Sequence, residues 1–276
     1  MSTAPRIGRA VGVQVLLWAY AGVAFGPLLL VLLGSLRGNR EIMREPLGLP
    51  TSPTFENFGR AWANASLSTY LLNSVVITVA AVTLCTVISL MAAYPLARWR
   101  FTGRALLAAY FLSGLMLPIK LGVLPIFYMF QSMGLVDSRI GLTLLYAAGG
   151  IPFSVFILMA FLRGLPTDIE EAARIDGVGE LRLFRSIVTP LSRPAIATVA
   201  VFQLAPTWND FFFPLILLRS SEKYTIPVGL SRFFGEFSTD RGALYAGLVL
   251  AVLPLVVVFV MASRQVVAGL TAGIGR

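Results

Sequence analysis

Residues 163–193 carry the sequence RGLPTDIEEAARIDGVGELRLFRSIVTPLSR, a polar stretch that lies between two long apolar runs. It holds five basic and five acidic residues in a chain that is 57% hydrophobic. An apolar run of about 18 residues or more is typical of a helix that spans a membrane. The stretch is therefore the largest compact segment in which this chain can meet a water-soluble partner.

The composition around this stretch decides the fold class. Only 13% of the residues are charged, and the mean hydropathy is +0.82, far outside the range of soluble proteins. We expect an all-α integral membrane protein whose residues 1–276 form a single transmembrane domain. Its six transmembrane helices are predicted at roughly residues 11–33, 71–94, 105–128, 142–162, 195–218 and 243–263. The runs are too long for barrel strands, which need about 10 alternating residues.

Basic residues indicate the orientation. With the N-terminus inside, twelve basic residues fall in the inner segments and nine in the outer ones, which are longer. This bias places both termini and residues 163–193 on the cytoplasmic side. It also explains the net charge of +9 without nucleic acid, because no basic stripe with interleaved aromatic residues is present. The first apolar run is too long for an ordinary signal peptide, so we expect it to remain as a helix.

Missing residue types exclude much chemistry. The chain has no histidine and one cysteine, Cys85, so it can build neither a Ser-His-Asp triad nor a His/Cys metal site. It also lacks the Gly-x-x-x-x-Gly-Lys-Ser/Thr loop that binds nucleotide phosphates. We therefore expect a protein that is not an enzyme and binds no metal. Any energy for its work must come from a gradient or from another subunit.

Local patterns in the polar stretch predict two short helices. Thr167 and Glu170 have the spacing of a capping box, and acidic residues crowd the first turn after Pro166. Gly177 stands where a left-handed residue would end this helix. A second amphipathic stretch follows, with apolar residues at Phe184, Ile187, Val188 and Leu191. Small residues at Ala172, Ala173 and Gly177 would let another protein approach closely, although an interfacial helix without a partner has the same pattern.

Polar residues inside the apolar runs indicate a substrate pathway. A charge in the middle of a membrane costs about 2.5–3.5 kcal/mol, so Lys120 and Asp210 should face a partner or a wet cavity. Trp208, Asn209 and Gln203 accompany Asp210, and an aromatic ring beside amides suits a sugar. Lys120 could instead extend to the interface, and Asn73 could line an outer gate or cap the second helix. Interior prolines such as Pro118 would open the backbone of most of these helices.

These segments resemble one known family. EAARIDG at 171–177, followed by IVTPL at 187–191, resembles the EAA signature of permease subunits from binding-protein-dependent ABC importers. Four further segments resemble the carbohydrate-uptake, maltose-type branch: Asn73-Ser74, WNDF at 208–211, YTIPVG at 224–229 and GLTAG at 269–273. The matches occur in order from about residue 53 to the C-terminus.

The resemblance implies a fold, partners and a site. It implies a type I ABC importer permease fold in the cytoplasmic membrane of a bacterium, with a cytoplasmic coupling helix at 168–177. Six spans would form half of a pore, so the partners implied are a second homologous permease, a dimeric ATPase that binds ATP and Mg, and an extracytoplasmic solute-binding protein. The substrate implied is a sugar or sugar derivative, and this chain would bind no cofactor itself.

The site residues follow from the same resemblance and from the polar patterns above. The coupling residues are Asp168, Glu170, Glu171, Ala172, Ala173, Arg174, Asp176 and Gly177, and the tail residues Leu270, Thr271 and Gly273 would extend toward the ATPase. The substrate-pathway candidates are Asn73, Lys120, Gln203, Trp208, Asn209 and Asp210.

Two other classes of protein remain open on the sequence. One is an ion-gradient-driven secondary transporter that uses Lys120 and Asp210 as coupling charges, although no internal repeat is visible. The other is a membrane scaffold that docks a soluble protein and transports nothing. Dependence of uptake on a separate ATPase would exclude the first, and any substrate flux would exclude the second.

Overall fold

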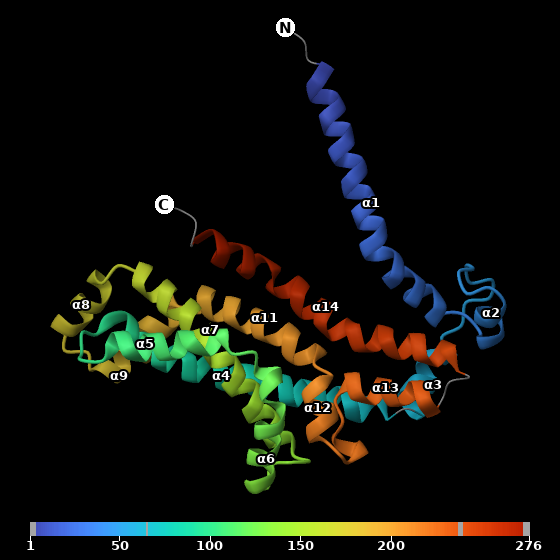
Figure 1. Ribbon diagram of the computed structural model, residues 1–276. Helices are drawn as coiled ribbons and strands as arrows, with labels where there is room; N and C mark the ends of the chain where they lie inside the picture. Colours follow the sequence, from blue (N-terminus) through green and yellow to red (C-terminus); the bar gives the residue numbers. More distant parts are fainter. Residues whose placement is uncertain (1–3, 65, 237–239, 273–276) are drawn as a thin grey trace. The chain divides into compact units, whose positions relative to one another are not determined.

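The computed structural model describes residues 4–64, 66–236 and 240–272, and every regular element in these ranges is helical (Figure 1). Side chains are described for residues 13–63, 66–231 and 240–261. The long helices are α1 (Ala4–Ser35), α4 (Leu67–Arg98), α7 (Arg139–Gly164), α11 (Arg193–Asn209) and α14 (Arg241–Ala272). An all-helical fold is therefore confirmed for the described part of the chain.

Four helices in these ranges are long and apolar enough to cross a membrane without a break. They are Val13–Ser35 of α1, all of α4, all of α7, and Arg241–Met261 of α14. Two pairs of bent helices also qualify if each pair counts as one span, which gives up to six. The six predicted spans are thus reached only when bent helices are included.

The third predicted span, at 105–128, is not a single helix. Its parts are α5 (Arg104–Ser113), η1 (Gly114–Met116), η2 (Ile119–Gly122) and α6 (Val123–Ser132). Arg104–Met116 and Ile119–Ser132 meet at 84°, a turn visible between α5 and α6 in Figure 1. Leu117 at the break is extended, as expected for a residue that precedes a proline. Pro118 therefore divides the span and does not merely kink it.

The fifth predicted span, at 195–218, is also divided. Helix α11 ends at Asn209, Asp210 is extended, and α12 (Phe212–Leu217) follows. Before α11, the chain makes α9 (Glu180–Leu183), the π-helical turn η3 (Phe184–Val188) and α10 (Thr189–Leu191). Glu180–Leu191 and Arg193–Asn209 meet at 70°. The apolar run thus begins with a bend beside Ser192 and breaks again at Asp210.

The contacts group the chain into two compact units, and each is described by itself. Unit 1 comprises Met1–Ser68 and Gly229–Leu253. It contains α2 (Asn39–Arg44), α3 (Glu56–Asn64) and most of α13 (Ile226–Glu236). The buried Asn57 side chain donates to the carbonyls of Ser35 and Arg37 at 2.7 and 2.9 Å. These bonds fix the segment between α1 and α3, while the prediction of a single domain stays a prediction.

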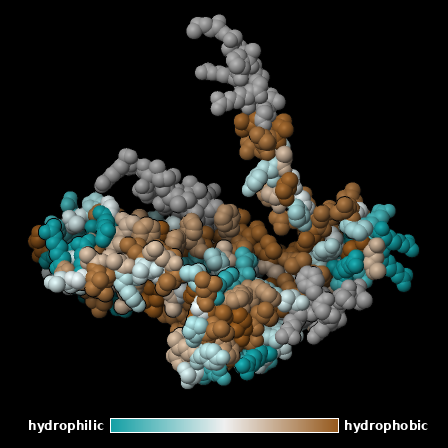
Figure 2. All heavy atoms as spheres, viewed as in Figure 1, coloured by the Kyte–Doolittle hydropathy of each residue, from teal (hydrophilic) through white to brown (hydrophobic). Residues whose placement is uncertain are grey.

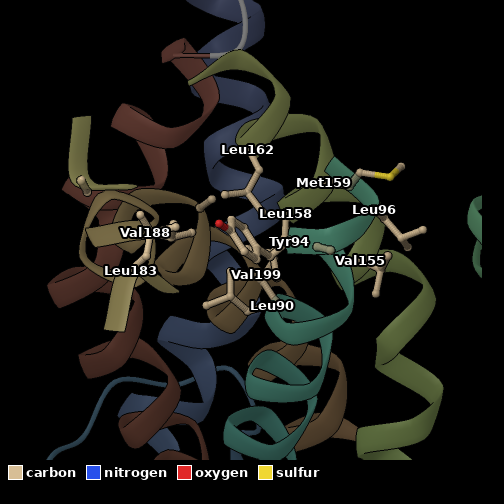
Figure 3. Close-up of a cluster of buried hydrophobic side chains, with 13 residues drawn as sticks. Leu90, Tyr94, Leu96, Val155, Leu158, Met159, Leu162, Leu183, Val188 and Val199 are labelled. Atoms are coloured by element: carbon tan, nitrogen blue, oxygen red, sulfur yellow. The ribbon is translucent and has the colours of Figure 1, made fainter. Parts of the chain in front are cut away.

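Unit 2 comprises Thr69–Val228 and Pro254–Arg276, and two apolar clusters lie among its described side chains. The first joins α4, α7 and α11 to the short helices of the polar stretch, with Tyr94 at its centre (Figure 3). The second joins α4, α6, α7 and α12 to the segment after η4 (Ser221–Lys223). Hydrophilic residues gather over the end that carries α8 (Asp168–Ile175) and α9, beside a largely hydrophobic middle (Figure 2).

Candidate functional site

The helix predicted at 168–177 is α8, and its C-terminus has the expected geometry. Gly177 has φ +78°, in the left-handed region that favours glycine. Its N–H donates to the carbonyl of Arg174 at 3.1 Å, and the N–H of Val178 donates to that of Ala173 at 3.0 Å. These two bonds form a Schellman motif, and Val178 packs on the same apolar cluster as Ala173. The left-handed cap at Gly177 is confirmed.

The predicted capping box at the other end of α8 is wrong. Thr167 has a helical conformation, and its side chain caps no N–H group. Glu170 does not turn back toward Thr167, because it is buried and points to the end of α4. The spacing of threonine and glutamate in the sequence is correct for a box, but a tertiary partner binds the carboxylate instead.

A buried ion pair joins α8 to α4. Arg98 Nε lies 2.7 Å from Glu170 Oε1, and the two side chains are 7% and 4% exposed. The Tyr94 hydroxyl donates to the other carboxylate oxygen at 3.2 Å, so both oxygens have a partner. Arg98 Nη2 also donates to the carbonyl of Leu165 at 3.1 Å, in the link between α7 and α8. Charged groups removed from water are tolerated when they are paired in this way.

A second, more exposed ion pair joins α8 to α9. Arg174 Nε lies 2.8 Å from Glu180 Oε1, with exposed fractions of 37% and 51%. Arg174 Nη2 also donates to the Tyr94 hydroxyl at 3.3 Å and lies 3.7 Å from Glu170 Oε2. The Tyr94 ring contacts Trp99 edge to face and Phe184 at a tilt. The inner side of α8 is thus attached to the neighbouring elements by both charge and packing.

The outward side of α8 differs from the expectation in two residues. Ala173 is 7% exposed and belongs to the apolar cluster, and Glu170 is 3% exposed, so neither can touch another protein in this conformation. The exposed residues of the helix are Asp168, Glu171, Ala172 and Arg174, together with Ile169 and Ile175, and Asp176 just after the helix is exposed as well. Ile175 is 86% exposed, and the sequence analysis missed it. Its spacing of three residues from Ala172 on a helix is the signal that could have found it.

The Asp210 carboxylate connects three helices. Asp210 Oδ2 accepts a hydrogen bond of 2.8 Å from the hydroxyl of Tyr146 on α7. It also accepts the N–H of Phe213, in the first turn of α12, at 3.2 Å. This places the carboxylate at the break between α11 and α12. The sequence predicted that Asp210 faces a partner or a wet cavity, and Tyr146 on α7 is such a partner, whereas contact with a substrate stays a prediction.

The other pathway candidates of the fifth span are only partly brought together. Gln203 donates to the carbonyl of Gly150 at 3.1 Å, which ties α11 to α7. Trp208 is buried, whereas Asn209 is exposed.

Lys120 is also exposed and lies in the break of the third span, with Nζ 5.7 Å from the centre of the Phe212 ring. Lys120 thus lies beside the break that contains Asp210.

Asn73 is neither a helix cap nor an exposed gate residue. Helix α4 begins at Leu67, well before Asn73, and this side chain is 1% exposed. Its amide donates to the carbonyls of Glu222 and Tyr224 at 2.9 and 3.0 Å. The next residue, Ser74, accepts the N–H of Ile226 at 2.9 Å. Both side chains hold the segment 222–226 against α4.

Asp137 makes a second set of contacts, with the adjoining loop 219–223, and the sequence did not predict them. Asp137, between α6 and α7, accepts the N–H groups of Arg219 and Ser220 at 2.9 and 3.0 Å. Its carboxylate also lies 2.8 Å from Lys223 Nζ. Burial raises the pKa of Asp137, but the hydrogen bonds from Lys223, Ser220 and Arg219 outweigh it and hold this pKa well below the usual range. The loop 219–223 is therefore fixed to the link between α6 and α7 by an ion pair and hydrogen bonds.

The remaining predicted residues lie at the C-terminus. Leu270 and Thr271 belong to α14, but their side chains are outside the described residues, and so is Gly273. Their approach to an ATPase stays a prediction. No group of three or more Cys, Asp or Glu residues that could hold a metal occurs in the part of the chain that the structure describes.

Comparisons with known proteins agree with this architecture. Residues 85–271 match the family described as "Binding-protein-dependent transport system inner membrane component". The diacetylchitobiose uptake system permease protein NgcG of Streptomyces coelicolor is 36% identical over 264 residues, which cover 95% of this chain and 87% of that protein. The arabinooligosaccharides transport system permease protein AraQ of Halalkalibacterium halodurans is 35% identical over 257 residues, 92% of this chain and 91% of that protein.

A solved structure shows the same fold. It is a bacterial ABC transporter involved in the import of the acidic polysaccharide alginate, and the superposition has a TM-score of 0.85. The match covers 96% of this chain and 98% of the other, at 24% sequence identity. The type I permease fold expected from the sequence is confirmed.

Proposed function

Since this chain belongs to the binding-protein-dependent inner membrane components and is an ABC importer permease, we propose that it forms half of a pore for a sugar or sugar derivative. The relatives named for diacetylchitobiose and arabinooligosaccharides support a carbohydrate substrate. A second, homologous permease would supply the other half of the pore. An extracytoplasmic binding protein would deliver the substrate.

The observation that carries this proposal is the outward side of α8. Ile175 and Ile169 are 86% and 49% exposed on a helix whose other outward residues are charged or small. Exposed apolar side chains surrounded by polar ones are typical of a surface that another protein covers. We therefore propose α8 as the coupling helix that docks on a separate ATPase. That partner would bind ATP and Mg, and this chain would catalyse nothing itself.

The attachment of α8 supports a mechanical role. An element that transmits motion must move as a rigid body with the helices that it drives. The buried ion pair of Glu170 with Arg98, together with the Schellman motif, provides such rigidity. In this proposal, closure of the ATPase dimer shifts α8, and the spans open the pore on the other side. Both termini and α8 would then lie in the cytoplasm.

A purification experiment tests the docking surface. The full-length chain is purified with its partners in mild detergent, as the wild type and as Ile175→Ser. We expect the ATPase and the second permease with the wild type, and a loss of the ATPase alone in the variant. Leu181→Ser is the matched control, because Leu181 is 67% exposed in the same polar stretch but lies on α9. Retention of the ATPase by Ile175→Ser would contradict the assignment.

The alternative of an ion-gradient carrier is not favoured by the family. It would also need Asp210 and Lys120 to exchange ions, whereas the Asp210 carboxylate already accepts two hydrogen bonds. Uptake that continues after removal of the ATPase would restore this alternative.

A further inference from the structure

Glu170 lies in the middle of the polar stretch, yet its carboxylate is directed into the protein. The Arg98–Glu170 contact joins residues 72 positions apart along the chain, and its side chains are among the least exposed charged groups. A buried ion pair gives little net stability, but loss of one partner leaves an unpaired charge. The Arg98–Glu170 ion pair therefore serves mainly to fix one arrangement of α8 against α4.

We propose that Glu170 is a positioning residue, and that through Arg98 it makes α4 the helix that carries the movement of α8 across the protein. This inference rests on the proposed function, since it assumes that a partner moves α8. It assigns Glu170 to the attachment of the helix and leaves contact with the partner to the outward residues.

The composition of α4 suits this task. Between Asn73 and Tyr94 it contains neither glycine nor proline, whereas α7 contains Gly149, Gly150 and Pro152. Proline and glycine weaken or bend helices. Among the long helices of the described ranges, α4 is the one with an unbroken interior of this length. Its single proline, Pro95, lies three residues before Arg98, and Tyr94, on the other side of this proline, also bonds Glu170.

The opposite end of α4 is attached just as firmly. Asn73 and Ser74 hold the segment 222–226 by three hydrogen bonds of 2.9 to 3.0 Å. At 1.5 Å per residue, Asn73 and Arg98 are roughly 38 Å apart along the helix axis. A displacement of α8 is therefore passed through one continuous helix to a loop at the far end.

The covalent connection from α7 to α8 is less direct. Helix α7 ends at Gly164, and residues 165–167 link it to α8 outside any helix. Arg98 itself holds this link through the carbonyl of Leu165. The side chain of Arg98 thus restrains both the link and the helix that follows it.

The first experiment tests the attachment in the isolated full-length chain. A Cys85→Ser background receives Ala173→Cys, and the rate of labelling by N-ethylmaleimide is measured in detergent. Because Ala173 is 7% exposed, slow labelling is expected until Glu170→Gln releases the helix. We expect an increase of roughly tenfold, within the usual range of coupling between two sites. Glu180→Gln, in the exposed ion pair, is the control that should leave the rate unchanged.

The second experiment tests transmission in the assembled complex. Glu222→Cys in the same background reports on the far loop, because the Glu222 side chain is exposed while its carbonyl is held by Asn73. Addition of ATP with orthovanadate should change its labelling rate. Either Glu170→Gln or Asn73→Leu should abolish that change, although the two sites lie at opposite ends of α4. Glu180→Gln should preserve it.

The outcomes separate the inference from the proposed function. If no ATPase accompanies the wild type, the proposed function fails, while labelling at residue 173 still decides the attachment. Unchanged labelling at residue 173 in Glu170→Gln overturns the positioning role. A nucleotide response that persists in Asn73→Leu overturns transmission through α4. Should Glu170→Gln not fold, Arg98→Met breaks the same ion pair from the α4 side, and wild-type behaviour in both assays would overturn the inference equally.

Discussion

Replacement of Arg98 by methionine should loosen α8 without unfolding the rest of the protein. Glu170 would keep only the Tyr94 hydroxyl at 3.2 Å and Arg174 at 3.7 Å, while its own side chain is 4% exposed. Removal of one partner from a buried pair typically costs about 3–5 kcal/mol, and the two remaining contacts favour the lower figure. A cost of about 3 kcal/mol corresponds to a roughly 100-fold larger opening constant.

Amide hydrogen exchange in the full-length chain measures this opening directly. The amides of Glu171 to Asp176 should lose about 100-fold of their protection in Arg98→Met, while those in the middle of α4 keep theirs. The double variant Arg98→Met with Glu170→Met should recover most of the loss, because no unpaired charge remains. Glu180→Gln should change protection by less than about tenfold, since exposed ion pairs contribute about 1 kcal/mol at most. If the amides of α8 are no better protected in the double variant than in Arg98→Met alone, the reasoning is refuted.

Three further predictions concern other positions. Gly177→Ala should destabilise the end of α8 by about 1–2 kcal/mol, because φ is +78° there, and exchange at Val178 measures it. Gly150→Ala should lower the thermal stability in detergent, because a Cβ would lie 2.7 Å from the Gln203 side chain and 2.8 Å from Cys85 Sγ; an unchanged midpoint would contradict this contact. Because the pKa of Asp137 is depressed, its ionised carboxylate stabilises the 219–223 loop in full at every pH above the ordinary carboxyl pKa of about 4. This stabilisation is lost as the pH falls from that value toward the depressed pKa of the folded protein. Amide exchange at Ser220, corrected for its intrinsic rate, should therefore stay constant from neutral pH to about 5 and speed up below about 4, and Asp137→Asn should show the fast exchange at every pH.

Sequence patterns predicted the structure correctly where neighbouring residues alone determine it. Gly177 was predicted in the left-handed region because only the backbone of its own turn decides that conformation. The same reasoning failed at Glu170, whose position in the helix was correct but whose partner is Arg98, 72 residues away. A capping box and a buried ion pair require the same glutamate, and the sequence does not show which partner will be near it.

The breaks in the apolar runs also depend on contacts between residues that are far apart in the sequence. Pro118 was recognised as an interior proline, but the extended Leu117 and the 84° bend depend on the helices around it. At Asp210 the helix ends because the carboxylate binds Tyr146 and the first turn of α12. Hydropathy averages over such breaks, because the apolar run continues through them.

The polar groups within the spans therefore divide into two kinds. Asn73, Gln203 and Asp210 were all predicted on the substrate pathway, yet each forms hydrogen bonds between elements of this chain. Polar groups inside a membrane must be satisfied, and packing against a neighbouring helix is the nearest way to achieve this. Contact with a sugar needs donors and acceptors that are still available. Lys120 and Asn209 are the pathway candidates whose side chains remain exposed, so we propose that a substrate would be recognised at the breaks that hold them.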